Sequence, residues 1–85
     1  MKIKILYFAR IKEALKFSSE YLELPEESLT LLSLKAYLAK RNDTWQQMLM
    51  GKLKVRGAIN HALVDDAALI HDGDEVAFFP PVTGG

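Results

Sequence analysis

The start of the chain alternates apolar and polar residues with a period of two, which is typical of a half-buried strand. Over residues 2–8 the expected inner face consists of Ile3, Ile5 and Tyr7. The outer face begins with a lysine and ends with two large apolar side chains, Leu6 and Phe8. Residues 75–79 alternate in the same way, so we expect a last strand with Phe78 facing inward and Phe79 outward.

Between these strands the spacing of apolar residues changes to that of helices. Residues 8–17 predict a short helix whose apolar side is formed by Ile11, Ala14 and Leu15. Residues 20–24 predict a second strand, antiparallel to the first. Thr30 is a suitable N-cap for the main helix, which we expect to run to about Lys40 with Leu31, Leu34 and Leu38 on one side.

The second half of the chain predicts another short helix and further strands. Asp43 can cap a helix that ends at Gly51. Residues 55–59 and 62–64 predict two strands joined by a turn at Asn60 and His61. We expect a loop after these strands, with a short helical turn through residues 69–70. Together the elements predict an α+β fold, in which a mixed sheet packs on one main helix with short extra helices.

The composition indicates one small domain. A chain of 85 residues leaves little room for an internal catalytic cavity. Eleven basic and eleven acidic residues give a formal net charge of zero, so we expect neither nucleic acid nor an anionic membrane as a partner. No apolar run approaches the roughly 20 residues needed to cross a bilayer, and no signal-peptide pattern follows Met1. We therefore expect a cytoplasmic protein.

Several charged residues could be taken for functional sites, but each has a simpler interpretation. The acidic residues of the second half flank turns, which favours turn hydrogen bonds over a metal site. They are Asp65, Asp66, Asp72, Asp74 and Glu75. His61 and His71 lack a nearby nucleophile pattern, so we expect exposed loop positions. Solvated faces are expected for Lys35, Lys40, Arg41, Lys52, Lys54 and Arg56, although residues 52–56 are also a candidate contact for an acidic rim on a partner.

The end of the sequence predicts a narrow arm. Pro80 and Pro81 stop the last strand, because neither has an N–H group to donate to a ladder. Residues 80–85 can extend to roughly 20 Å. The last two residues, Gly84 and Gly85, have no side chains, which suits a channel too narrow for a Cβ atom and presents the α-carboxylate as the reacting group. The alternative is a frayed terminus without a function.

Residues 72–85 resemble the C-terminus of the small subunits of molybdopterin synthase, which are ubiquitin-like sulfur carriers. The resemblance extends to residues 3–10, Ile-Lys-Ile-Leu-Tyr-Phe-Ala-Arg, and to the length of the chain, whereas residues 18–54 are only compatible with it. It implies a β-grasp (ubiquitin-like) fold. It also implies a division into a β-grasp domain at residues 1–79 and an extended Gly-Gly tail at residues 80–85.

The resemblance further implies that a ubiquitin-activating-like enzyme uses ATP to adenylate Gly85, and that a sulfur donor converts the adenylate into a thiocarboxylate. The arm would then insert into the large subunit of molybdopterin synthase, where sulfur passes to cyclic pyranopterin monophosphate to form the dithiolene. The expected arm residues in this channel are Pro80, Pro81, Val82, Thr83 and Gly84. The family assembly is a heterotetramer, in which the small subunit carries sulfur without catalysing a reaction alone.

Two features of the sequence agree with that chemistry. The sequence contains no cysteine, so sulfur cannot travel on a side-chain thiol. Gly51 and Lys52 lack the rest of a P-loop pattern, so we expect no bound cofactor, and ATP would be used by the activating partner.

A partner interface is expected beside the root of the arm. If the first and last strands are neighbours, as the resemblance implies, Phe8 and Phe79 meet there, and Leu63 lies just past a turn. A cluster of such residues would form a docking surface. The alternative is that they cover minor hydrophobic gaps, since scattered exposed apolar residues are normal.

Three other functions stay open. A sulfur carrier for thiamine synthesis would share the terminal chemistry, but such proteins are usually shorter and lack both the helix after the first strand and the Phe-Phe-Pro-Pro sequence. A protein modifier would form an isopeptide bond through Gly85. A ubiquitin-like interaction module would have an inert tail.

Overall fold

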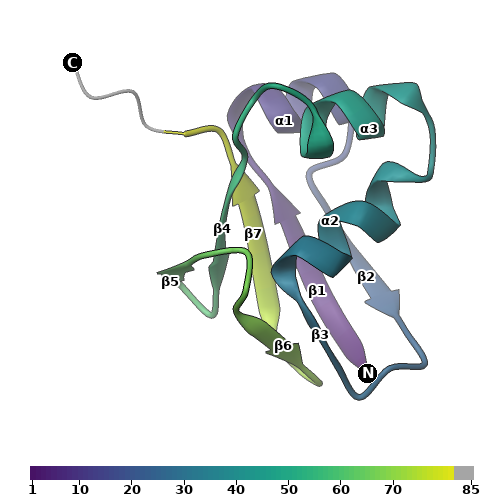
Figure 1. Ribbon diagram of the computed structural model, residues 1–85, viewed down its shortest axis with the longest axis vertical. Coiled ribbons are helices and arrows are strands. Elements are labelled where there is room, and N and C mark those ends of the chain that lie inside the picture. The colour runs from purple at the N-terminus through teal and green to yellow at the C-terminus, as the bar shows by residue number, and fades with distance from the viewer. Residues whose placement is uncertain (82–85) are drawn as a thin grey trace.

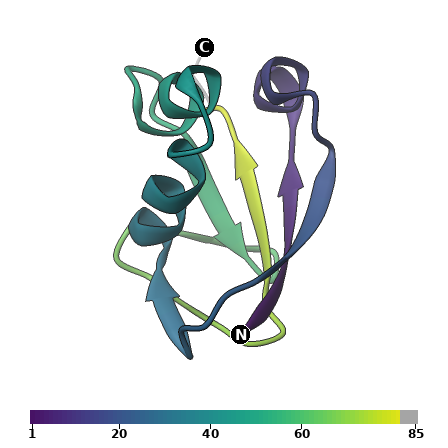
Figure 2. The ribbon, with the colours of Figure 1, turned by 90° about the vertical axis from the view of Figure 1, so that its right-hand side faces the viewer.

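The computed structural model describes residues 1–81, and its framework is a mixed sheet with helices against one face (Figure 1 and Figure 2). The strands of this five-stranded sheet are β1 (Lys2–Tyr7), β2 (Ser19–Glu23), β4 (Arg56–Ile59), β5 (Ala62–Val64) and β7 (Glu75–Phe79). The helices are α1 (Ala9–Leu15), α2 (Leu31–Ala39) and α3 (Asp43–Met50). A separate two-stranded ladder consists of β3 (Ser28–Thr30) and β6 (Leu69–His71).

The strand order β2-β1-β7-β4-β5 places the first and last strands side by side in the middle of the sheet. β1 and β7 run parallel, with Tyr7 opposite Phe78. β4 flanks the other side of β7 in antiparallel orientation, with Arg56 opposite Phe79. β1 and β7 therefore end, and β4 begins, at the same end of the sheet, which we call the arm end.

The hydrophobic core lies between the sheet and α2, which runs alongside one face of the sheet in Figure 2. Thr30 Oγ1 accepts a hydrogen bond from the Ser33 backbone N–H at 3.1 Å and caps α2 as predicted. The predicted inner positions of both layers are buried, namely Ile3, Ile5, Tyr7, Leu31, Leu34, Leu38, Val76 and Phe78. Burial of this apolar surface is the main favourable contribution to folding.

Most of the predicted elements are confirmed, including the three helices and the strands near residues 2–8, 20–24, 55–59, 62–64 and 75–79. The turn between β4 and β5 has positive φ at Asn60 (50°) and His61 (71°), as the two central residues of a type I′ hairpin require. None of the helices formed by residues 1–81 is long and apolar enough to cross a membrane.

Two predictions about local structure were wrong. Asn42, and not Asp43, is the N-cap of α3, since its side chain accepts a hydrogen bond from the Trp45 N–H at 3.2 Å. Residues 69–70 belong to β6 and not to a helical turn. Their partner strand, β3, lies about forty residues earlier, with Leu29 opposite Ile70, and a local pattern cannot reveal so distant a pairing.

Candidate functional site

The root of the arm is fixed by the two strands on either side of β7. Phe79 is the last residue of β7, between β1 and β4 in the sheet. The Phe8 backbone N–H donates a hydrogen bond to the Phe78 carbonyl oxygen at 3.0 Å, which extends the pairing of β1 and β7 to this point. Pro80 and Pro81 follow and are half-buried. The remaining predicted arm residues lie outside the described part of the chain, and they are Val82, Thr83, Gly84 and Gly85.

Phe8 and Phe79 occupy neighbouring positions on adjacent strands, as expected. Leu6 pairs with Ala77, so the next outward-facing residues along these parallel strands, Phe8 and Phe79, are neighbours on the outer face of the sheet. Phe8 is 46% exposed, and Phe79 is half-buried. This face points away from α2 and the core. The two aromatic side chains therefore stand beside the place where the arm leaves the sheet.

Leu63 lies on the same face but farther from the arm. It is 59% exposed and pairs with Ala58 of β4, which in turn pairs with Ala77 of β7. Neighbouring strands are spaced by about 4.8 Å, so the Leu63 backbone lies roughly 10 Å from β7. We call the apolar residues of this surface the outer-face patch, and they are Leu6, Phe8, Ala58, Leu63, Ala77 and Phe79. Its role as a docking surface stays a prediction.

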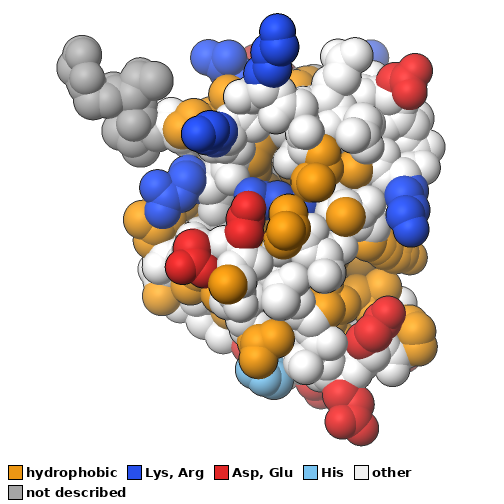
Figure 3. Space-filling view, viewed as in Figure 1, with side chains coloured by type: hydrophobic (Ala, Val, Ile, Leu, Met, Phe, Trp, Pro, Cys, Tyr) orange, Lys and Arg blue, Asp and Glu red, His pale blue; other side chains and the backbone are white. Residues whose placement is uncertain are grey.

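The opposite face of the molecule has a groove that the sequence did not indicate. The groove has a volume of about 600 Å³ and lies between α2, the end of α3 and the segment that leads into β4 (Figure 3). Its lining includes Leu32, Met50, Leu53, Val64, Lys54 and Arg56. The groove is open and combines apolar walls with charged side chains, and Lys35 and Asp66 meet within it.

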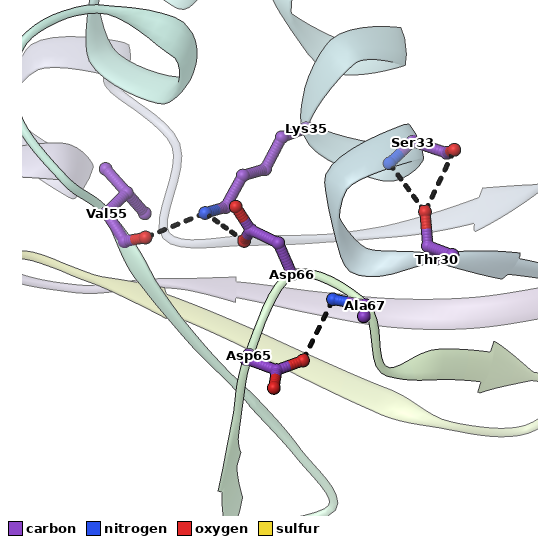
Figure 4. A network of polar contacts seen from close by, with 7 residues as sticks. All are labelled: Thr30, Ser33, Lys35, Val55, Asp65, Asp66 and Ala67. Atoms are coloured by element: carbon purple, nitrogen blue, oxygen red, sulfur yellow. Dashed lines mark hydrogen bonds and ion pairs between the residues drawn. The ribbon is translucent and has the colours of Figure 1, made fainter.

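The expectation that Lys35 lies on a solvated face was wrong. Lys35 is 5% exposed, and its Nζ donates hydrogen bonds to the Val55 carbonyl oxygen and to Asp66 Oδ1, both at 2.8 Å (Figure 4). A buried ammonium group requires such partners, because an unpaired buried charge is very costly. The sequence contained a signal for this position, since Lys35 follows Leu31 by four residues and therefore belongs to the buried stripe of α2.

A second polar cluster connects β2 with the end of α2. Arg41 donates two hydrogen bonds to the Glu20 carboxylate, each 2.8 Å long, and the Tyr7 hydroxyl donates a third at 2.7 Å. The Arg41 guanidinium lies 4.3 Å from the centre of the Trp45 ring, which is a cation–π contact. Sequence analysis missed this cluster because its members come from four separate elements.

The cluster changes the acidity of its members. Burial, together with the hydrogen bond to Glu20, raises the pKa of the Tyr7 phenol well above its usual value. Burial alone would also raise the pKa of the Glu20 carboxyl group. The hydrogen bonds from Arg41 and Tyr7 outweigh burial, so the pKa of Glu20 lies below its usual value. These groups stabilise one another within the fold and lie away from the outer-face patch.

Turn hydrogen bonds are confirmed for two of the five acidic residues, Asp65 and Asp74, whereas Asp72 accepts a hydrogen bond from the distant Lys2 N–H. Asp65 accepts a hydrogen bond from the Ala67 N–H at 2.9 Å, and Asp74 accepts one from the His71 N–H at 2.8 Å. Asp66 differs, since it is the ion-pair partner of Lys35. Within residues 1–81 no three His, Asp or Glu side chains gather as metal ligands would.

Comparison with known proteins identifies the family to which this chain belongs. The ThiS family model matches residues 5–85. The chain belongs to the ThiS family. The molybdopterin synthase sulfur carrier subunit of Escherichia coli, a relative of this ThiS-family chain, is 39% identical to it over 83 residues, which cover 98% of this chain and 99% of the relative.

Solved structures confirm the β-grasp fold of this ThiS-family protein. SAMP1 from Haloferax volcanii superposes with a TM-score of 0.79 at 20% identity, and the match covers 100% of both chains. A chain from the complex of subunits 1 and 2 of molybdopterin-converting factor of Helicobacter pylori superposes with a TM-score of 0.67 at 24% identity, again over 100% of both chains. At these levels of identity the likeness concerns the fold.

Proposed function

We propose that this protein is the sulfur carrier subunit of a molybdopterin synthase, with the Gly85 α-carboxylate as its reacting group. The observation that carries the proposal is the 39% identity with a molybdopterin synthase sulfur carrier subunit over nearly the whole of both chains. The fold supports it, because the arm follows β7, the middle strand of the sheet, whose end is held between Phe8 and Arg56.

The chemistry follows from the properties of a carboxylate. A carboxylate is a poor electrophile, so an adenylating enzyme first joins a Gly85 oxygen to the α-phosphorus of ATP and releases pyrophosphate. A persulfide sulfur then attacks the Gly85 carbonyl carbon and displaces AMP, and a thiol reduces the resulting S–S bond to leave a thiocarboxylate. In the synthase the sulfur moves to cyclic pyranopterin monophosphate, and oxygen from water restores the carboxylate.

The partner that receives the sulfur is proposed to be the large subunit of molybdopterin synthase, in a heterotetramer. The relative from Helicobacter pylori was solved as a complex of subunits 1 and 2 of molybdopterin-converting factor. The outer-face patch suits such a complex, because exposed aromatic side chains near the centre of an interface provide much of its binding energy. Insertion of the arm would then require little further ordering at its base, where Pro80 and Pro81 restrict the backbone.

Helix α1 favours this acceptor over the thiamine pathway. α1 occupies residues Ala9–Leu15, between β1 and β2. This is the helix that carriers for thiamine synthesis are expected to lack. Both pathways share the same terminal chemistry, so the precursor that accepts the sulfur distinguishes them.

The proposal is tested by mass spectrometry of the C-terminal peptide after incubation with ATP, a sulfur source and the cognate adenylating enzyme. We expect replacement of one Gly85 oxygen by sulfur. The peptide is measured because methionine oxidation gives nearly the same mass change, and the chain contains three methionines. An unmodified Gly85, with a known carrier converted in parallel, would contradict the proposal and favour a protein modifier or an interaction module.

A further inference from the structure

The net charge of zero conceals a strong polarity along the strands. The arm end of the sheet carries six basic side chains, namely Arg10, Lys12, Lys16, Lys52, Lys54 and Arg56, and two acidic ones, Glu13 and Asp65. The opposite end carries six acidic side chains, namely Glu23, Glu26, Glu27, Asp72, Asp74 and Glu75, and two basic ones, Lys2 and Lys4. Each end therefore has an excess of four side-chain charges, of opposite sign, and the Met1 ammonium group, which binds the Leu24 and Glu26 carbonyl oxygens, lowers the acidic excess to three.

The topology explains this separation. β1 and β7 both end at the arm end, so α1, which follows β1, lies there with Arg10, Lys12 and its C-cap residue Lys16. β4 begins there, which brings the segment before it to the root of the arm. The turns that precede β7 and follow β2 lie at the other end, where Asp72 Oδ1 accepts a hydrogen bond from the Lys2 N–H at 2.7 Å. In Figure 3 several basic side chains lie at the top and near the start of the arm and acidic ones lie at the bottom, although single acidic side chains also lie at the upper right and at mid-height.

Three of the basic residues form a strip directly beside the arm. Lys52, Lys54 and Arg56 are exposed, and Val55 between them is buried. Arg56 lies opposite Phe79, one residue before Pro80. None of the three forms an ion pair with another residue of the described part of the chain. We call these residues the cationic strip.

The remaining charged groups offset the strip in part. Lys35 pairs with Asp66, and Arg41 pairs with Glu20. Asp65 follows β5 across from the start of β4, and it keeps its negative charge while accepting a hydrogen bond from the Ala67 N–H, so it offsets one of the three charges of the strip. Lys35 and Arg41 are each paired with a carboxylate. The electrostatic potential at the root of the arm is therefore set mainly by the cationic strip and by Arg10, Lys12 and Lys16.

We propose that the cationic strip steers the arm toward an acidic surface on the adenylating enzyme, around the opening that receives Gly85. This inference rests on the proposed function. A carrier must bind and release its activating enzyme once for each sulfur atom, whereas the outer-face patch suits a lasting complex. Complementary charge raises the association rate without requiring tight binding, which is what such a repeated encounter needs.

A protein partner fits the polarity better than a nucleic acid or a membrane. Both of those present negative charge over a large area, and the acidic end of this molecule would be repelled as the basic end approaches. An acidic patch on a protein can be confined to the surroundings of the opening. The polarity would then also orient the carrier, with the arm facing the partner and the acidic end facing away.

The test compares Lys52→Glu and Lys54→Glu with Lys2→Glu, which changes the net charge equally at the opposite end. Pyrophosphate release by the cognate adenylating enzyme is measured against carrier concentration at low and high salt. We expect each strip variant to lower kcat/KM roughly three- to tenfold at about 0.02 M salt and to approach the unsubstituted protein at about 0.5 M. The kcat at saturation and the activity of Lys2→Glu should stay unchanged.

Three results would overturn the assignment of the strip while leaving the proposed function intact. One is a normal kcat/KM for both strip variants at low salt. Another is a defect that persists at high salt or lowers kcat, which would indicate a role other than steering. The third is tight binding of the unsubstituted protein to a single-stranded oligonucleotide, lost in the strip variants, which would assign the strip to nucleic acid instead. No pyrophosphate release by the unsubstituted protein, with a known carrier active in parallel, overturns the proposed function and this partner together.

Discussion

Lys35 connects two segments that are far from it in the sequence. Its ammonium group binds the carbonyl oxygen of Val55, just before β4, and the carboxylate of Asp66, just after β5. Val55 is followed by Arg56, which lies opposite Phe79 at the root of the arm. One side chain of α2 therefore helps to place the strand that supports the arm.

Replacement of Lys35 by methionine is expected to lower the free energy of unfolding. Methionine keeps the apolar stem but leaves the Val55 carbonyl oxygen without its partner, which costs about 1–3 kcal/mol. Asp66 is half-exposed and can return to water. Denaturant unfolding measures the change, and Lys40→Met, at the exposed end of the same helix, should cost less than about 1 kcal/mol. Equal stability of both variants would contradict a structural role for the Lys35 contacts.

Phe79 is expected to contribute to binding of the large subunit without contributing to the core. Its side chain lies on the outer face, whereas its neighbour Phe78 is fully buried. Phe79→Ala should weaken binding by about tenfold or more, as for an aromatic residue central to an interface, with unchanged circular dichroism. Titration calorimetry with the large subunit measures this. Tyr21→Ala is the control, because Tyr21 is an exposed aromatic residue on the same face of edge strand β2. Unchanged affinity of Phe79→Ala would remove Phe79 from the interface.

At the scale of elements, the Glu20 cluster joins β2 to the connection between α2 and α3. The fold pairs β2 only with β1, so β2 is an edge strand of the sheet. The two hydrogen bonds from Arg41 and the one from Tyr7 hold this edge strand against the helical layer. The same arrangement places Arg41 on the ring of Trp45 in α3.

The cluster predicts a loss of stability in acid. Because the pKa of Glu20 is lowered in the folded protein, its contribution is present above the unfolded value of about 4.5 and is lost as the pH falls through the lower folded value. Glu20→Gln should therefore flatten the acid side of the curve of stability against pH. Urea unfolding at a series of pH values measures this, with Glu23→Gln, an exposed position on the same strand, as the control. If Glu20→Gln left the acid side of this curve unchanged, the loss of stability in acid would be due to other carboxylates.

At the scale of the whole molecule, the domain and the arm are proposed to act separately. Within residues 1–81 the core consists of strand and helix residues together with Leu24 and Val55 beside them, and its last member is Phe78. Folding should therefore not need the reacting terminus, and sulfur transfer should need it absolutely.

Deletion of Gly85 is expected to abolish thiocarboxylate formation and molybdopterin synthesis while leaving the free energy of unfolding unchanged. The carboxylate would still exist on Gly84, but it would lie about 3.5 Å short of the reacting position. Thr83→Ser, which keeps the arm length and both glycines, should retain activity. Reconstitution with the adenylating enzyme, a sulfur source and the large subunit measures the outcome. Molybdopterin synthesis by the truncated protein would refute the mechanism.

The sequence by itself determined those features that depend on neighbouring residues. The period of two in residues 2–8 and the leucine stripe after Thr30 predicted strand, helix, cap and inner face, because these follow from local geometry and burial. The ending of β7 before Pro80 followed from the missing N–H group of proline. The resemblance in residues 72–85 supplied the family and the proposed chemistry.

Only the tertiary structure decided features that join distant segments. The pairing of β3 with β6, the burial of Lys35 between Val55 and Asp66, and the hydrogen bonds to Glu20 join residues that are 13 to 43 positions apart. The charge polarity likewise arose from the strand directions, since β1 ends and β4 begins at the arm end, which gathers basic residues from two separate segments there. Composition records the number of charges, and the fold determines which charges lie together.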